Sequence, residues 1–201
     1  ELTFGGDFNQ PISQGFIPSS VKRLKFGRNF NQNILPGVIP LSVEILDLGM
    51  RSDYINRDTI PNTVKQLTSG KLWKYDPSEY IIPKSVIKFI YVGSRSLEPY
   101  DIPDSVQELT FGDFFDQSFC KDVIPPSVQI LTFGKNFNQT ILPGVIPSSV
   151  QELTFGDSFN RPISQGTLPP FVKMVTFGDK FNNLRRNSIP DSVKILILGK
   201  T

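Results

Sequence analysis

The sequence predicts a β-rich repeat solenoid, a right-handed parallel coil of about nine turns with about 22 residues each. Two observations predict it. An apolar residue followed by proline recurs nine times, with 20 to 22 residues from one proline to the next. A valine stands three residues after every one of these prolines, and a glycine follows each valine at nearly constant spacing. Self-similarity of this period is typical of solenoids, in which every repeat forms one turn.

Each turn is expected to begin with a bend at the proline. Proline lacks the N–H group that a strand ladder needs, and the serine or threonine that follows most of these prolines favours a turn. The segment Ile17-Pro18-Ser19-Ser20 is an example. The bends are predicted at Pro18, Pro40, Pro61, Pro83, Pro103, Pro125, Pro147, Pro169 and Pro190.

A short strand is expected to follow each bend. In the pattern Val-x-x-Leu-x-Phe-Gly, leucine and phenylalanine lie two residues apart and share one face of an extended strand, while the residue between them points away. Val128, Leu131, Phe133 and Gly134 follow this pattern. A turn of about 22 residues has room for one strand and a returning loop but little helix. This is typical of a leucine-rich-repeat-like coil, with parallel strands about 4.8 Å apart.

A Phe-Asn pair follows the glycine in the more regular repeats. The phenylalanines are expected in the core, because aromatic side chains are the main apolar filling for so thin a coil. The asparagine amides can bond backbone groups where the chain leaves the strand, so we expect a structural ladder from turn to turn and not a ligand site. The asparagines of this ladder are Asn9, Asn31, Asn138, Asn160 and Asn182.

The patterns Leu-Thr-Phe-Gly-x-x-Phe-Asn-Gln-x-Ile and Ile-Pro-x-Ser-Val resemble the FNIP repeat, a relative of the leucine-rich repeat, over essentially the whole chain. Proteins with this repeat occur largely in amoebae and in large DNA viruses that infect amoebae, and some carry an F-box ahead of the repeats. The resemblance therefore implies a recognition arm, in some members for a ubiquitin ligase.

No F-box is visible in residues 1–201, which we interpret as a single FNIP-repeat solenoid domain. The first residues, Glu1 to Gly5, fall inside an expected strand, and the sequence stops just after another. Solenoids need polar caps over their terminal turns. We therefore expect the chain to be a part of a longer protein.

Composition argues against catalysis and against several classes of partner. The chain has no histidine and one cysteine, Cys120, so neither the common nucleophile–base pairs nor a Cys/His zinc site can be assembled. The net charge is +2 without a block of like charge, and no apolar stretch approaches the ~18 residues of a membrane span. We therefore predict a non-enzymatic protein without cofactor, metal, nucleic-acid or membrane partners. The lone cysteine favours a reducing compartment, the cytoplasm, which would be the host-cell cytoplasm for a viral protein.

The outward positions of the strands are the first candidate protein-binding surface. A repeat array presents one residue per turn on a continuous wall. Several of these positions are apolar, which is typical of a contact surface but also of β-branched residues that simply suit strands. The candidates on this wall are Lys88, Ile90, Glu108 and Ile130.

The irregular middle of the chain is the second candidate surface. All five tyrosines and the single tryptophan lie between Tyr54 and Tyr100. Tyr75, Tyr80 and Tyr100 fall in irregular loops without an assigned core position, and exposed tyrosine often anchors protein interfaces. Simple loss of the repeat pattern is the competing interpretation.

The function predicted from the sequence is a scaffold that binds another protein, whose identity stays open. The family resemblance implies, more narrowly, the substrate-recognition arm of an F-box ubiquitin ligase. The alternative is a structural repeat array that self-associates through its solenoid ends in an assembly or particle.

Overall fold

The computed structural model describes residues 1–50, 55, 58–70 and 82–199, and the chain divides into two compact units, Glu1–Gly93 and Ser94–Thr201. The described strands of the first unit are β1 (Leu2–Thr3), β2 (Arg23–Lys25), β3 (Ile45–Asp47), β4 (Gln66–Ser69) and β5 (Lys88–Tyr91). Those of the second unit are β6 (Glu108–Phe111), β7 (Ile130–Thr132), β8 (Glu152–Thr154), β9 (Met174–Thr176) and β10 (Ile195–Ile197). The single domain over residues 1–201 stays a prediction.

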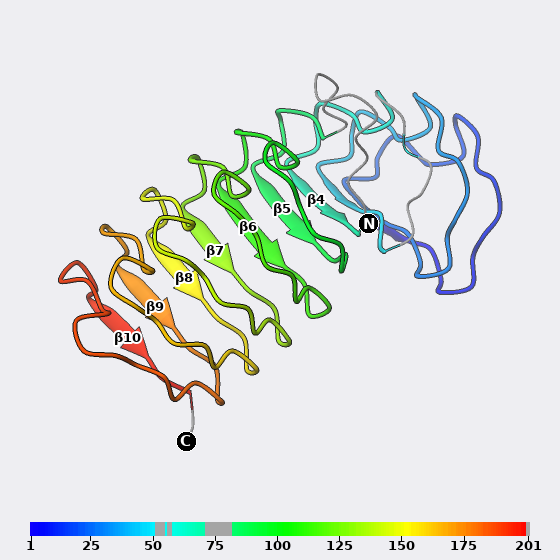
Figure 1. Cartoon of the computed structure of the whole chain (residues 1–201). Coiled ribbons are helices and arrows are strands. Elements are labelled where there is room, and N and C mark those ends of the chain that lie inside the picture. The colour runs from blue at the N-terminus through cyan, green and yellow to red at the C-terminus, as the bar shows by residue number, and fades with distance from the viewer. Residues whose placement is uncertain (51–54, 56–57, 71–81, 200–201) are drawn as a thin grey trace. The chain divides into compact units, whose positions relative to one another are not determined.

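Within each unit, every strand pairs in parallel with the strand of the next turn. In the second unit β6 to β10 follow one another in this order, from green to red in Figure 1. Leu131 pairs with Leu109 on one side and with Leu153 on the other. All three leucines are buried, and their strand neighbours face outward. The predicted parallel, leucine-rich-repeat-like coil is therefore confirmed for the described turns of each unit.

Two columns of phenylalanine fill the interior of the second unit. In the first column, the ring centroids of Phe133 and Phe155 lie 5.4 Å apart, and those of Phe155 and Phe177 lie 5.1 Å apart. A second column contains Phe137 and Phe159, whose centroids are 6.0 Å apart. Phe155 also stacks on Phe159 of its own turn at 4.2 Å. Stacking within and between turns therefore makes each ring part of a continuous, buried apolar layer.

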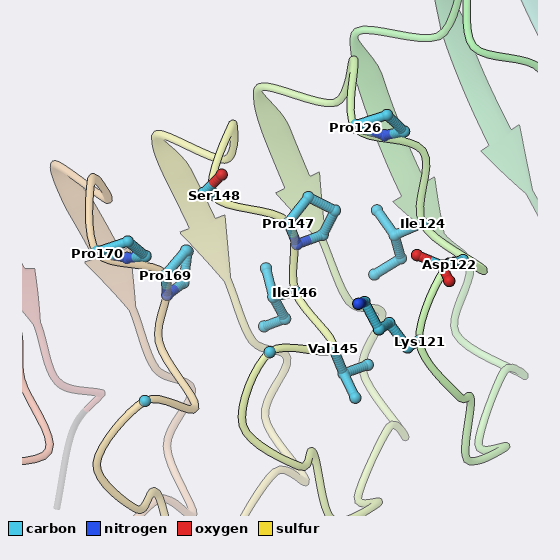
Figure 2. Close-up of a pocket in the computed structure, with 12 residues that line it drawn as sticks. Lys121, Asp122, Ile124, Pro126, Val145, Ile146, Pro147, Ser148, Pro169 and Pro170 are labelled. Carbon is cyan, nitrogen blue, oxygen red and sulfur yellow. The ribbon is translucent and has the colours of Figure 1, made fainter.

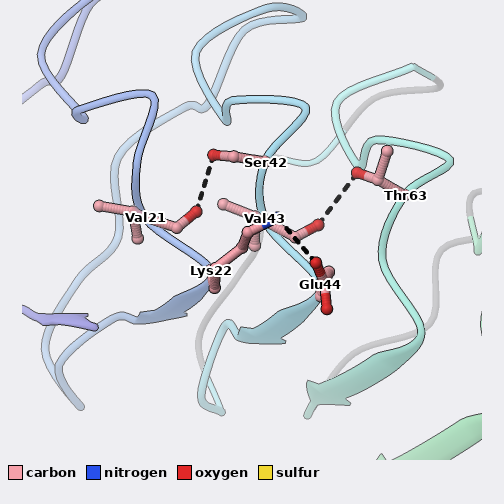
Figure 3. A network of polar contacts seen from close by, with 6 residues as sticks. All are labelled: Val21, Lys22, Ser42, Val43, Glu44 and Thr63. Carbon is pink, nitrogen blue, oxygen red and sulfur yellow. Dashed lines mark hydrogen bonds and ion pairs between the residues drawn. The ribbon is translucent and has the colours of Figure 1, made fainter.

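The nine described bends are closed by the same backbone hydrogen bond, and five of them are tied to the preceding turn by a hydroxyl group. The N–H of Val43 donates to the carbonyl oxygen of Pro40 at 3.1 Å. In Figure 3 the Ser42 hydroxyl donates to the carbonyl oxygen of Val21, and the Thr63 hydroxyl donates to that of Val43. Ser85, Ser127 and Ser192 make the equivalent bond in later turns. The hydroxyl after the proline therefore links turns as well as favouring a bend.

A surface ion pair accompanies these bends in the first unit. Lys22 Nζ lies 2.8 Å from Glu44 Oε1 on the next turn (Figure 3). The hydrogen bond and the positive charge of Lys22 lower the pKa of the Glu44 carboxyl. Because both side chains are largely exposed, the pair contributes little to stability.

The glycine that ends most of the described strands allows backbones of neighbouring turns to touch. A Cβ atom built on Gly156 would clash with the carbonyl group of Gly134 and with Cα of Lys135. A Cβ atom on Gly178 would clash in the same way with the carbonyl group of Gly156. The atoms that would clash belong to the backbone, so they cannot move aside as the end of a flexible side chain could. Glycine is therefore required sterically at Gly156 and Gly178.

We predict that Gly156→Ala lowers the free energy of unfolding by about 3 kcal/mol, because the added methyl group forces two turns apart. Gly5 holds the same position in its repeat, but a Cβ atom there meets no atom within 4 Å. Gly5→Ala is therefore the matched control, with a change within about 0.5 kcal/mol. Urea unfolding followed by circular dichroism measures both. Equal losses in the two variants would contradict the steric explanation.

Candidate functional site

The four wall candidates of the sequence all lie on strands and face outward. Lys88 and Ile90 lie on β5 of the first unit, and Glu108 and Ile130 lie at the starts of β6 and β7 in the second. All four side chains are partly exposed. The structure thus places these residues on strand surfaces, while their role in binding stays a prediction.

Two ordered columns run along the outward face of the second unit. One column alternates acidic and apolar side chains, since Ile130 pairs with Glu108 on one side and with Glu152 on the other, and Met174 follows. The other column consists of threonines at successive turns: Thr110, Thr132, Thr154 and Thr176. Backbone pairing fixes the spacing of both columns, so this wall presents a regular pattern of methyl, hydroxyl and carboxylate groups.

Within the described residues, three of the five ladder asparagines, Asn9, Asn138 and Asn160, bond to the backbone of the following turn. Asn9 Oδ1 accepts the N–H of Asn31 at 2.8 Å. In the second unit the N–H of Asn160 donates to Asn138 Oδ1, and the N–H of Asn182 donates to Asn160 Oδ1, both at 2.9 Å. These amide oxygens are engaged in joining turns, which is a structural use of the side chains.

A left-handed residue recurs just before the bends. The third residue before the proline has a positive φ in eight repeats. Seven of the eight are glycine, aspartate or asparagine, the residue types that tolerate this conformation. These seven residues are Gly15, Gly37, Asp58, Asp122, Gly144, Gly166 and Asn187.

The eighth residue at this position is Tyr100, with a φ of 71°. A bulky residue in the left-handed region is an outlier, because its Cβ atom crowds the following carbonyl group. The Tyr100 side chain is 63% exposed, so core packing does not offset this strain. The other two candidate tyrosines, Tyr75 and Tyr80, lie outside the described residues. Tyr100 is thus a strained and exposed aromatic residue at a place where smaller residues fit.

Two neighbouring cavities lie along this edge of the second unit. A cavity of about 240 Å³ is lined by Tyr100, Ile102, Asp104, Asp122, Pro125 and Pro126. A second cavity of about 380 Å³ extends over the following two turns and is mostly apolar (Figure 2). The two cavities share Asp122 and Pro126 in their linings. The two cavities therefore adjoin at these residues, and together we call them the proline-edge trough, defined by these two linings.

The sequence did not predict the proline-edge trough, and Tyr100 is the one lining residue that it singled out for binding. Asp104 and Asp122 belong to different turns, and they line one cavity only once the coil has brought their bends together. The left-handed position could have been found, since glycine, aspartate or asparagine recurs three residues before most of the prolines. Tyr80 stands at that same sequence position before Pro83.

A coil of short repeats with a packed interior and regular outer columns defines the class of repeat solenoids typical of protein-interaction scaffolds. The FNIP Repeat family model matches residues 1–28, 8–50, 94–136, 115–158, 137–180 and 159–201, and the chain belongs to this family. The described part of the chain contains no helix long and apolar enough to cross a membrane.

The chain is similar to a solved structure described as that of CroV588, a novel circular LRR protein. The TM-score is 0.81 and the sequence identity is 35%. The match covers 98% of this chain and 30% of that one, so the chain spans less than a third of the length of the protein that it resembles. A comparison with curated proteins found no match.

We predict that Asn160→Ala destabilises the coil by about 1 kcal/mol, because the N–H of Asn182 loses its acceptor and the amide of Asn183 keeps only the carbonyl oxygen of Asn160. Asn160→Asp keeps that acceptor and is expected to be nearly neutral. Asp116 supports this control, since its Oδ1 accepts the N–H of Asn138 at 2.8 Å. Thermal unfolding of the two variants measures the difference. Similar losses for Ala and Asp would show that the ladder bond is unimportant.

We also predict that Tyr100→Gly stabilises the protein by about 1 kcal/mol, because glycine adopts a positive φ without strain. Tyr100→Ala removes the same ring but keeps the Cβ atom, so it should give no such gain. The comparison of glycine with alanine in urea unfolding separates backbone strain from loss of the ring. A glycine variant no more stable than the alanine variant would refute the strain.

Proposed function

We propose that the chain is a scaffold that binds another protein through the outward face of its strands. The observation that carries this proposal is the fixed register of the wall in the second unit, where partly exposed Ile130 and Met174 flank Glu152. Apolar side chains held beside a carboxylate at a fixed backbone spacing favour recognition of a folded partner, because the backbone needs no rearrangement to present them.

The division of labour among the residues supports the same function. The phenylalanine columns and the ladder asparagines act between turns, and both are committed to holding the coil. The side chains that differ from turn to turn lie on the outward strand positions and along the bends. In repeat proteins such variable surface positions distinguish one partner from another.

As a finer form of this proposal, the bound protein is the substrate of an F-box ubiquitin ligase in the cytoplasm, with the ligase-binding segment elsewhere in the full protein. Support comes from the family, in which some members join FNIP repeats to an F-box. The similarity to a longer circular LRR protein, of which this chain spans 30%, agrees with a longer protein around these repeats.

Proximity labelling in the source cells tests the wall. We predict that the double variant Ile130→Gln and Met174→Gln loses the main partner, because both substitutions replace apolar contact area with amides that must be desolvated. Gln66 already holds this position in the first unit, so glutamine suits the strand. The double variant Ile130→Val and Met174→Leu is the matched control and is expected to keep the partner.

The recovered proteins distinguish the alternatives. A partner recovered with ubiquitin-ligase subunits and lost from the glutamine variant supports the finer form. A partner lost from that variant without ligase subunits supports the scaffold alone. Recovery of only further copies of this chain, unchanged in either variant, would replace the scaffold with the self-associating array.

A further inference from the structure

The smaller cavity of the proline-edge trough has the chemistry of a site for a cationic side chain. Its charged lining consists of two carboxylates, Asp104 and Asp122, and contains no cation. Within residues 94–199 neither carboxylate makes a hydrogen bond or an ion pair through its side chain. Both are exposed and come from neighbouring turns. An anion would be repelled there, and a cation would have two acceptors.

The uncharged walls of the same cavity suit a cation on a long aliphatic chain. Exposed Pro126 offers apolar surface, along which the methylene groups of lysine or arginine can lie, while Ile102 and Pro125 line the cavity as largely buried residues. The Tyr100 ring adds an aromatic face of the kind that attracts ammonium and guanidinium groups. A volume of about 240 Å³ is smaller than the roughly 300–1,000 Å³ of pockets that enclose whole small molecules. One side chain of a larger ligand is therefore the better match.

The second cavity continues the site along the coil. Figure 2 shows Pro147 and then Pro169 and Pro170 following Pro126 on successive turns, so that the lining is a row of rigid apolar rings. Lys121 lines this second cavity and not the first, and its charge disfavours a second cation there. The two ends of the trough therefore differ in the group that they suit: a cation at the Tyr100 end and an apolar group beside Pro147.

The Tyr100 ring is the feature that sets this cavity apart from the other repeats, because tyrosine is strained at this backbone position. Seven other repeats carry glycine, aspartate or asparagine at the same position, and Asp122 does so within the same cavity. A tyrosine there costs stability and gains no core contact, since its side chain is 63% exposed. A contact between the ring and a ligand would explain why a strained tyrosine stands at this position.

We propose that the proline-edge trough binds an extended segment of a partner protein that contains lysine or arginine. The basic side chain lies between Asp104, Asp122 and the Tyr100 ring, and an apolar side chain two positions away lies in the second cavity. Alternate side chains of an extended peptide point the same way, so both can face the trough. This proposal rests on the protein-binding role proposed above and names the chemistry of one partner segment.

Blocked peptides of defined sequence test the site on the full chain. The two probes are acetyl-Gly-Lys-Gly-Leu-Gly-amide and the reversed order acetyl-Gly-Leu-Gly-Lys-Gly-amide, because either direction along the coil satisfies the proposal. Titration of the nitrogen-15-labelled protein is followed by the backbone amide signals. We expect at least one probe to shift signals at residues 100–104 and 121–126, and to bind more weakly as salt is added. The same peptides with glutamine or glutamate in place of lysine should not bind.

Variants locate the interaction. Tyr100→Gly should weaken binding about five-fold through loss of the ring, and Tyr100→Phe should retain it. Asp122→Asn should weaken binding about three-fold through loss of charge, without new backbone strain, since Asn187 holds the same position in a later repeat. Asp191 stands directly after its proline, as Asp104 does, but it does not line either cavity. Asp191→Asn is therefore the matched control for net charge and should bind normally.

Equal binding of the lysine and glutamate peptides would overturn the proposal, as would shifts confined to other residues or no shifts at millimolar peptide. Unchanged binding by Tyr100→Gly would also overturn it. The Tyr100→Gly variant is expected to be more stable than the original chain, so unfolding cannot explain a loss of binding. In the cellular experiment, a partner lost only from the wall variant and kept by Tyr100→Gly defeats the peptide site and leaves the scaffold intact. Failure to recover any partner defeats the scaffold itself.

Discussion

Contact between backbones of successive turns, at the glycine that ends most of the described strands, is the constraint on which the other interactions depend. Gly156 can approach the carbonyl group of Gly134 only because it lacks a Cβ atom. This approach fixes the height and the register of one turn on the next. Once the register is fixed, phenylalanine rings of the same repeat position stack, and Asn138 and Asn160 come within hydrogen-bonding distance. A slip of one residue would turn the buried leucines outward and would separate all these pairs at once.

The same register explains why most of the fold was predictable from the sequence. Equal spacing of proline, valine, leucine and glycine identifies the turns, and alternation along Val-x-x-Leu-x-Phe identifies the buried face. The bonding of Asn31 to Asn9 follows from their equal positions in neighbouring repeats. The role of the serine after the proline was only half predicted. A local pattern indicates a bend, but the bond from Ser42 to the carbonyl oxygen of Val21 depends on where the preceding turn lies.

The candidate surfaces were predictable to different degrees. Alternation places Glu108 and Ile130 on the outward face, so their positions follow from the sequence, whereas their use in binding depends on a partner that the sequence does not contain. Tyr100 stood out only as an irregularity. Its strain becomes visible when φ is known, and its neighbours Asp104 and Asp122 line one cavity because their turns stack. Such a site is formed by stacking of turns, and no local motif encodes it.

An irregular residue is also what a site for an extended segment on a regular coil requires. Two residues of an extended peptide span roughly 6.6 Å, whereas neighbouring turns lie roughly 4.8 Å apart, so a peptide laid across the turns cannot match each of them equally. A uniform row of prolines would accept the same segment at several neighbouring places with similar affinity. Tyr100 occurs at one turn of the described edge, where the two carboxylates also lie. A single strained aromatic residue can thus set one register for the segment, which identical repeats alone cannot do.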